Sequence, residues 1–282
     1  MKPVPAACRD FCLWPYAPPQ QPLAEALDGA DLLLAVAALA GCAEDWRRLI
    51  ADVRAELGPY ATVWGVKHEA GRLGVELYFY DYGRQDRQVS LARVMVALGG
   101  WADCAARLDD ALPYFMVSLE LPLAAGALPA RLEAVDVYIG NPGSTVSSGI
   151  CYKVDASGAE LKNFYFFFNR ATEWEAALGK LGCGMRASLD PAAEQRLLPE
   201  WLRRCRTVVV ANKRHADALY VSGIGAEDLA RFLEWRDWPA GFAALVRAGA
   251  EHYRHLLFDV GYDFTLREGV VHPQKSSFYG VF

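Results

Sequence analysis

The chain has 282 residues, a formal net charge of −5 and 22% charged residues. A chain of this length can bury a large core, and barrels often use such a length for a single domain. The charge excludes a general nucleic-acid-binding surface, which would need a basic face toward phosphate, so no nucleic-acid partner is predicted.

The seven cysteines are scattered along the chain without the spacing of a metal site. This distribution is typical of reduced, buried thiols in a reducing compartment. No stretch reaches the ~18 to 20 apolar residues of a membrane span, and no apolar leader follows Met1. We therefore expect a cytoplasmic protein with no membrane span and no metal ligands.

The N-terminal residues 1–22 contain six prolines. Because proline fixes φ and lacks a backbone donor, an extended arm is predicted there, followed by one α+β domain over residues 23–282. Apolar residues at helical spacing predict a helix pair or one kinked helix over residues 23–57, ended by Gly58 and Pro59. The helical period returns over residues 89–112.

Five pairs of β-rich runs account for much of the remaining chain. In the first pair a short connection containing Gly71 joins residues 62–68 to residues 73–82. Along the second run, apolar side chains alternate with polar and aromatic ones. The other predicted pairs are 115–121 with 135–140, 148–155 with 161–168, 207–212 with 218–222, and 257–266 with 275–282. Further helices are predicted at 172–181, 226–236 and 241–254.

The strands have one apolar face and one face of polar and aromatic residues. The apolar faces need a cover, which amphipathic helices supply, and closing the sheet removes exposed edges and turns the polar faces inward. We therefore predict an α+β fold in which about ten antiparallel strands form a barrel or strongly curved sheet, with helices outside. The competing arrangement is an open sheet with helices on one face and solvent on the other.

The side chains predicted to face inward combine tyrosines with carboxylates and ammonium groups, which suits an organic ligand that also bears charge. Two glutamates are candidate general bases, because burial would raise a carboxylate pKa toward neutrality. Either could instead be a strand residue paired with Lys153 or Lys67. The candidate catalytic residues are Glu76 and Glu120, and the candidate substrate-binding residues are Tyr78, Tyr80, Tyr138, Lys153, Asn163, Tyr165, Tyr220, Lys275 and Tyr279; Ser118, Asp136 and Ser277 share the predicted inward face.

The order of elements through Ala218–Ser222, Leu257–Phe264 and Lys275–Tyr279 resembles the repeat of the ABBA-type prenyltransferases. The resemblance covers roughly residues 60–282 and is one of pattern. It implies a ten-stranded barrel, an isoprenoid diphosphate as co-substrate, and Mg²⁺ as the ion that would accompany it. It further implies that Lys153 and Lys275 hold the diphosphate, that Glu76 or Glu120 acts on the acceptor, and that tyrosines shield an allylic cation, namely Tyr78, Tyr80, Tyr165, Tyr220 and Tyr279.

These observations predict an enzyme of specialised metabolism that modifies a small molecule or a peptide. Its most concrete form is transfer of a prenyl group from an isoprenoid diphosphate to an aromatic or peptide acceptor. The alternative is a non-catalytic protein that binds a ligand or peptide and acts as a scaffold with a partner enzyme.

Overall fold

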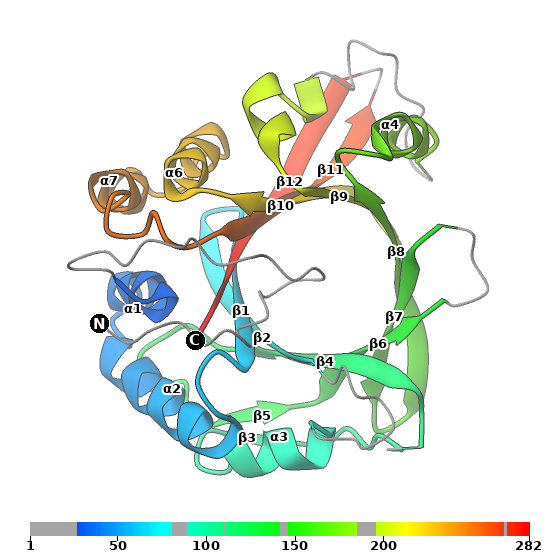
Figure 1. The fold of residues 1–282 in the computed structure, drawn as a ribbon. Helices are drawn as coiled ribbons and strands as arrows, with labels where there is room; N and C mark the ends of the chain where they lie inside the picture. The colour runs from blue at the N-terminus through cyan, green and yellow to red at the C-terminus, as the bar shows by residue number, and fades with distance from the viewer. Residues whose placement is uncertain (1–26, 81–88, 110, 142–145, 185–195, 268–269) are drawn as a thin grey trace.

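The computed structural model describes residues 27–80, 89–109, 111–141, 146–184, 196–267 and 270–282. Ten antiparallel strands close into a barrel in the order β1-β12-β11-β10-β9-β8-β7-β6-β4-β2 (Figure 1). The barrel strands are β1 (Thr62–Glu69), β2 (Arg72–Tyr80), β4 (Tyr114–Leu121), β6 (Ala134–Gly140), β7 (Ser148–Asp155), β8 (Gly158–Asn169), β9 (Thr207–Lys213), β10 (Asp217–Ile224), β11 (Phe258–Arg267) and β12 (Val270–Val281). The predicted α+β barrel is confirmed, and so is the antiparallel pairing of the five predicted strand pairs.

Strand β1 closes the barrel because it pairs on both sides. Val63 lies opposite Tyr78 of β2 and opposite Val281 of β12. Every strand of the barrel is thereby hydrogen-bonded to two neighbours. Closure satisfies the backbone groups that an open sheet would expose at its edges, which decides against the open arrangement.

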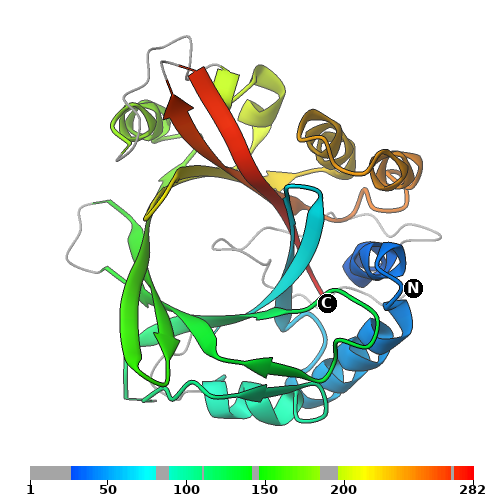
Figure 2. The ribbon, with the colours of Figure 1, turned by 180° about the vertical axis from the view of Figure 1, so that it is seen from behind.

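Helices cover the outside of the barrel, where Figures 1 and 2 show them around its circumference. Helix α2 contacts β1, α1 contacts β12, α4 contacts β8 and β9, and α6 contacts β11. The helices are α1 (Gly29–Leu39), α2 (Ala43–Leu57), α3 (Leu91–Ala97), α4 (Trp174–Gly182), α6 (Ala226–Trp235) and α7 (Ala240–Ala248), with a 3₁₀ helix, η1, at Glu200–Arg204. No helix in the described ranges is both long enough and apolar enough to cross a membrane.

The outward faces of the strands form the core with these helices. Trp64 and Leu77 on neighbouring strands are fully buried, as are Trp46 and Leu49 of α2. Burying apolar surface of this kind contributes about 25 cal/mol per Å² and is the main favourable term in folding. The inward faces are therefore left to line the interior of the barrel, which we call the lumen.

The first helix is fixed by its cap. Asp28 accepts a hydrogen bond from the backbone of Ala30 at 3.0 Å, and Asp31 accepts one from the backbone of Asp28 at 2.8 Å. This reciprocal arrangement satisfies backbone donors that a helix leaves unpaired at its N-terminus. Asp28 also pairs with Arg54 of α2 at 2.6 Å, which ties the two helices together.

The helix predicted over residues 89–112 is wrong beyond Ala97: α3 ends there, Gly99 and Gly100 follow, and the chain enters the short strand β3 (Ala102–Cys104). Strand β3 pairs in parallel with β5 (Ala130–Leu132) outside the barrel. The helix pair over 23–57 is found as α1 and α2, whereas the proline-rich arm at 1–22 lies outside the described residues.

Candidate functional site

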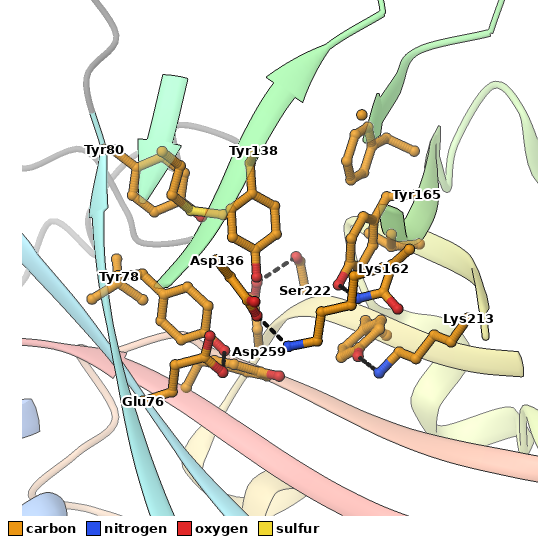
Figure 3. Close-up of a pocket in the computed structure, with 18 of the residues that line it drawn as sticks. Glu76, Tyr78, Tyr80, Asp136, Tyr138, Lys162, Tyr165, Lys213, Ser222 and Asp259 are labelled. Atoms are coloured by element: carbon orange, nitrogen blue, oxygen red, sulfur yellow. Dashed lines mark hydrogen bonds and ion pairs between the residues drawn. The ribbon is translucent and has the colours of Figure 1, made fainter. Parts of the chain in front are cut away.

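The lumen contains a pocket bordered by residues from all ten barrel strands (Figure 3). The empty space among its side chains amounts to about 1020 Å³, including the part that is open to solvent. The lining residues are Val63, Lys67, Glu76, Tyr78, Tyr80, Phe115, Met116, Asp136, Tyr138, Gly149, Lys162, Asn163, Tyr165, Phe167, Val209, Lys213, Tyr220, Ser222, Asp259, Lys275 and Tyr279.

Five tyrosines pack ring to ring around the lumen, and we call them the tyrosine girdle. Their ring centroids are 5.8 Å apart for Tyr78 and Tyr279, 6.3 Å for Tyr279 and Tyr220, 6.3 Å for Tyr220 and Tyr165, and 6.0 Å for Tyr165 and Tyr138. These spacings are within the range of favourable aromatic pairs. The rings come from β2, β12, β10, β8 and β6, every second strand of the barrel.

Polar contacts complete the circle between the two ends of the girdle. Tyr78 Oη donates a hydrogen bond to Glu76 at 2.7 Å. Ser118 Oγ donates to Glu76 Oε1 and lies 3.4 Å from Tyr138 Oη. The girdle and these two side chains therefore surround the lumen without interruption.

Small residues on the strands between the tyrosines make room for the rings. Tyr220 lies opposite Gly261, and a Cβ atom at Gly261 would be only 2.0 Å from the Tyr220 ring. The flat ring therefore lies across the neighbouring strand, along the barrel wall. Two further tyrosines have a glycine directly opposite: Tyr279 opposite Gly65, and Tyr165 opposite Gly149.

The girdle hydroxyls remain neutral phenols, because burial raises the pKa of all five tyrosines well above the ordinary value. Besides the hydroxyls of Tyr78 and Tyr138, the other three also contact a polar neighbour. Tyr165 Oη accepts from Asn163 at 2.9 Å, Tyr220 Oη accepts from Lys213 at 2.7 Å, and Tyr279 Oη is 2.8 Å from Ser277 Oγ.

Three lysines form a second group, the lysine cluster of Lys67, Lys213 and Lys275. Lys213 Nζ lies 2.7 Å from Asp263 Oδ1, and Lys275 Nζ lies 3.4 Å from Asp263 Oδ2. Burial lowers the pKa of Lys275, and repulsion from the other two ammonium groups adds to the effect. The cluster thus brings three ammonium groups into one part of the lumen, each of them in contact with a carboxylate.

Glu76 is ionised, contrary to the expectation that burial would raise its pKa. Its side chain is 4% exposed, and burial alone does act in that direction. However, Lys67 lies 2.5 Å from Glu76, and with Lys162 and Ser118 it lowers the pKa to about 2. The favourable charge outweighs desolvation here, so a role for Glu76 as general base near neutral pH loses its physical support.

Glu120 lies at the rim of the lumen. It pairs across the strands with Glu76, and its carboxylate contacts the Lys67 ammonium group, but its side chain is 67% exposed. It does not line the pocket among the described residues. Lys67 therefore bridges two glutamates, one buried and one in solvent.

Asp136 has the opposite behaviour to Glu76. Its carboxylate pairs with Lys162, as the dashed line in Figure 3 shows, yet burial and then the nearby charge of Glu76 raise its pKa. Two carboxylates of one site whose pKa values move apart are suited to different roles in proton transfer. Asp136 is the better proton acceptor, and Glu76 the better fixed negative charge.

The structure replaces the predicted Lys153 with Lys162. Lys153 is exposed and does not line the pocket. The β7–β8 pairing shifts register after Cys151 and Asn163, so that Lys162 is an extra residue of a β-bulge. Because a bulge breaks the two-residue alternation, Lys162 and Asn163 both line the pocket.

We expect Lys162→Met to weaken ligand binding by about tenfold or more, since loss of the ammonium group leaves the Asp136 carboxylate unpaired in the lumen. Lys153→Met should leave binding unchanged, because that side chain lies outside the pocket. Titration calorimetry of both variants with the same ligand measures the difference in dissociation constant. Equal losses of affinity in both variants would contradict the placement of Lys162 in the pocket and of Lys153 outside it.

The remaining predicted residues fall where the alternation placed them. Glu76, Tyr78, Tyr80, Tyr138, Asn163, Tyr165, Tyr220, Lys275 and Tyr279 all line the pocket. Beside Tyr80, an apolar part of the lumen is formed by Val63, Phe115, Met116, Phe167 and Val209. The lumen therefore offers a ligand apolar and aromatic walls as well as a charged region.

Sequence reasoning missed the roles of Lys67 and Lys213. The sequence indicates Lys67 only as an ion-pair partner of a glutamate, although the alternation puts it on the inward face of β1 with Val63 and Gly65. The predicted strands 207–212 and 218–222 leave Lys213 in the connection between them, but β9 extends to include it. Asp263 alternates with Asp259 and Gly261 on β11, which is a signal that could have identified it.

No group of three or more metal-binding side chains that could hold a metal ion occurs in the described part of the chain. Of the carboxylates that line the pocket, Glu76 contacts Lys67 and Asp136 contacts Lys162, whereas Asp259 accepts hydrogen bonds from Ser222 and from the backbone of Gly223. Asp263, which is not among the lining residues, contacts Lys213. The residues present do not form a metal centre by themselves.

No family model matches the chain, and no curated protein matches it. Among solved structures, the chain is similar to AnaPT from Neosartorya fischeri, an ABBA prenyltransferase, with 12% sequence identity and a TM-score of 0.49. The match covers 90% of this chain and 92% of that chain. The similarity is one of fold, and no residue role is inferred from it.

Proposed function

We propose that this chain is an enzyme that transfers a prenyl group from an isoprenoid diphosphate to an aromatic or peptide acceptor inside the barrel. The observation that carries this proposal is the tyrosine girdle, closed by ionised Glu76, with the lysine cluster in the same lumen. Such a reaction involves an allylic cation, a diphosphate anion and an acceptor that loses a proton. The girdle suits the cation, the lysines suit the diphosphate, and the carboxylates suit the acceptor.

The girdle would stabilise the cation. The faces of aromatic rings attract positive charge, more strongly where water is excluded. The five girdle phenols are neutral and buried, so they neither repel the cation nor bring charge that would trap it. The apolar part of the lumen would receive the hydrocarbon chain.

In the transfer, the bond between the allylic carbon and the diphosphate oxygen breaks, and its electron pair leaves with the diphosphate. An electron pair of the acceptor forms the new bond to that carbon. The proton that the acceptor then releases passes to Asp136, whose raised pKa suits a proton acceptor, while Glu76 holds an N–H or O–H group of the acceptor. Lys213 and Lys275 would hold the diphosphate.

The test is calorimetric titration with dimethylallyl and geranyl diphosphates, followed by mass spectrometry of aromatic amino acids and peptides incubated with both. We expect geranyl diphosphate to bind more tightly than dimethylallyl diphosphate, since each additional buried CH₂ contributes about 0.8 kcal/mol. A product heavier by one prenyl group would follow. Absence of binding up to about 1 mM, which corresponds to about 4 kcal/mol, would exclude the proposal.

One observation favours a non-catalytic ligand-binding protein as the second candidate. Each lysine that lines the pocket contacts a carboxylate, so its charge is already compensated within the protein. A scaffold of this kind would bind the acceptor or a peptide for a partner enzyme. Binding of a peptide without any prenylated product, at saturating prenyl diphosphate, would support this candidate instead.

A further inference from the structure

Asp263 pairs with two of the three lysines of the lysine cluster. Asp263 is 8% exposed. Its Oδ1 lies 2.7 Å from Lys213 Nζ, and its Oδ2 lies 3.4 Å from Lys275 Nζ. Lys213 also donates to Tyr220 of the girdle. Asp263 does not itself line the pocket among the described residues, but it pairs with Lys213 and Lys275, which do and to which the anionic group of a ligand would have to bind.

The position of Asp263 is built into the sheet. Asp263 is in regular register with Ala218 of β10 and shares the inward alternation of Asp259 and Gly261. On its other side one residue of β11, Asp263, faces two of β12, Gln274 and Lys275, so the bulge belongs to β12 and lies at Lys275. Bulges are common beside functional sites. Burial alone would raise the pKa of Asp263, but Lys213 and Lys275 outweigh it and lower the pKa, so the carboxylate is ionised.

A ligand anion would compete with Asp263 for the same two ammonium groups. If it displaced the carboxylate, Asp263 would remain buried without its partners, and an unpaired buried charge is strongly unfavourable. If both anions stayed, they would repel each other across a short distance. Either way, the protein's own carboxylate lowers the affinity of this region for any anion.

We propose that Asp263 is a specificity-determining residue that competes, as an internal anion, with ligand phosphate groups for Lys213 and Lys275. An anion without an apolar chain then binds too weakly to occupy the lumen. An anion that carries an apolar chain binds more tightly, because the chain also contacts the tyrosine girdle and the apolar part of the lumen. The released inorganic pyrophosphate would lose those apolar contacts and leave. The inference rests on the proposed function for the identity of the ligand.

The experiment uses the full chain and inorganic pyrophosphate as the probe. Asp263→Asn keeps the shape of the side chain and removes its charge, so we expect pyrophosphate to bind about tenfold more tightly or better than to the unchanged protein. The affinity for geranyl diphosphate should rise by a similar factor. Asp263→Ser provides a second variant, and near-ultraviolet circular dichroism confirms that each variant is folded.

The matched control is Glu160→Gln, which removes one negative charge from the exposed pair of Glu160 and Arg214. Pyrophosphate affinity should not change in that variant. The inference is overturned if neither Asp263 variant binds pyrophosphate more tightly than the unchanged protein, or if Glu160→Gln gains as much. Failure of the proposed function is a separate result: geranyl diphosphate would then bind the unchanged protein no better than pyrophosphate, whatever Asp263→Asn does.

Discussion

Replacing Lys67 with methionine is expected to lower the free energy of unfolding by about 3–5 kcal/mol at neutral pH. The Lys67 ammonium group is the contact that keeps Glu76 ionised at 3% exposure. Without it, burial dominates, and the protein must either hold an unpaired carboxylate or bind a proton. Chemical denaturation of the variant and the unchanged protein at pH 7 measures the loss.

The loss of stability in Lys67→Met should depend on pH, in a direction that follows from the pKa of Glu76. In the unchanged protein the pKa of Glu76 falls from 4.5 to about 2, so its contribution to stability is present above pH 4.5 and is lost as the pH falls toward 2. This contribution is on the order of 3 kcal/mol. In Lys67→Met the pKa of Glu76 should exceed 4.5, so the deficit is largest near neutral pH and shrinks on acidification.

The double variant Lys67→Met/Glu76→Gln is the control, since it removes the buried charge together with its partner. It should recover a large part of the stability at pH 7, whereas Glu120 needs no compensation because its side chain is in solvent. Equal stability of the single and double variants at every pH would show that Glu76 does not depend on Lys67.

The second large effect is expected for Gly261→Ala. The added methyl group would lie 2.0 Å from the Tyr220 ring, so the ring must move into the lumen, away from Lys213 and from its neighbours in the girdle. Overpacking of this kind costs about 1–3 kcal/mol. At this chain length the melting temperature should fall by roughly 2–4 °C for each kcal/mol, and ligand binding should be lost with the displaced ring.

Gly74→Ala is the matched control on strand β2, because a Cβ atom there would meet nothing within 4 Å. It should be neutral or slightly stabilising, by about 0.5–1 kcal/mol, since alanine loses less freedom on folding than glycine. In a Tyr220→Ala background, Gly261→Ala should cost little, because the atom that it would strike is gone. A cost that persists in that background would place the effect elsewhere than at the Tyr220 ring.

The two-residue alternation is sufficient to predict which strand faces turn inward wherever it is regular. Tyr78, Tyr138 and Tyr220 line the lumen because neighbouring positions along a strand point to opposite faces. The same alternation placed Lys153 in the site, whereas the structure has it exposed near the end of β7. It did not reveal Lys162, because the bulge in β8 depends on pairing with β7. Local pattern cannot record an interruption that arises between two strands.

Closure of the barrel and ionisation of its buried carboxylates both depend on contacts between strands that the tertiary structure brings together. The pairing of β1 with β12 joins segments from opposite ends of the described chain, so no local signal distinguishes a barrel from an open sheet. The ionisation of Glu76 depends on Lys67 lying beside it, and that of Asp263 on Lys213 and Lys275. Side-chain direction follows from the backbone of one strand, whereas a pKa depends on distances to charges that only folding brings together.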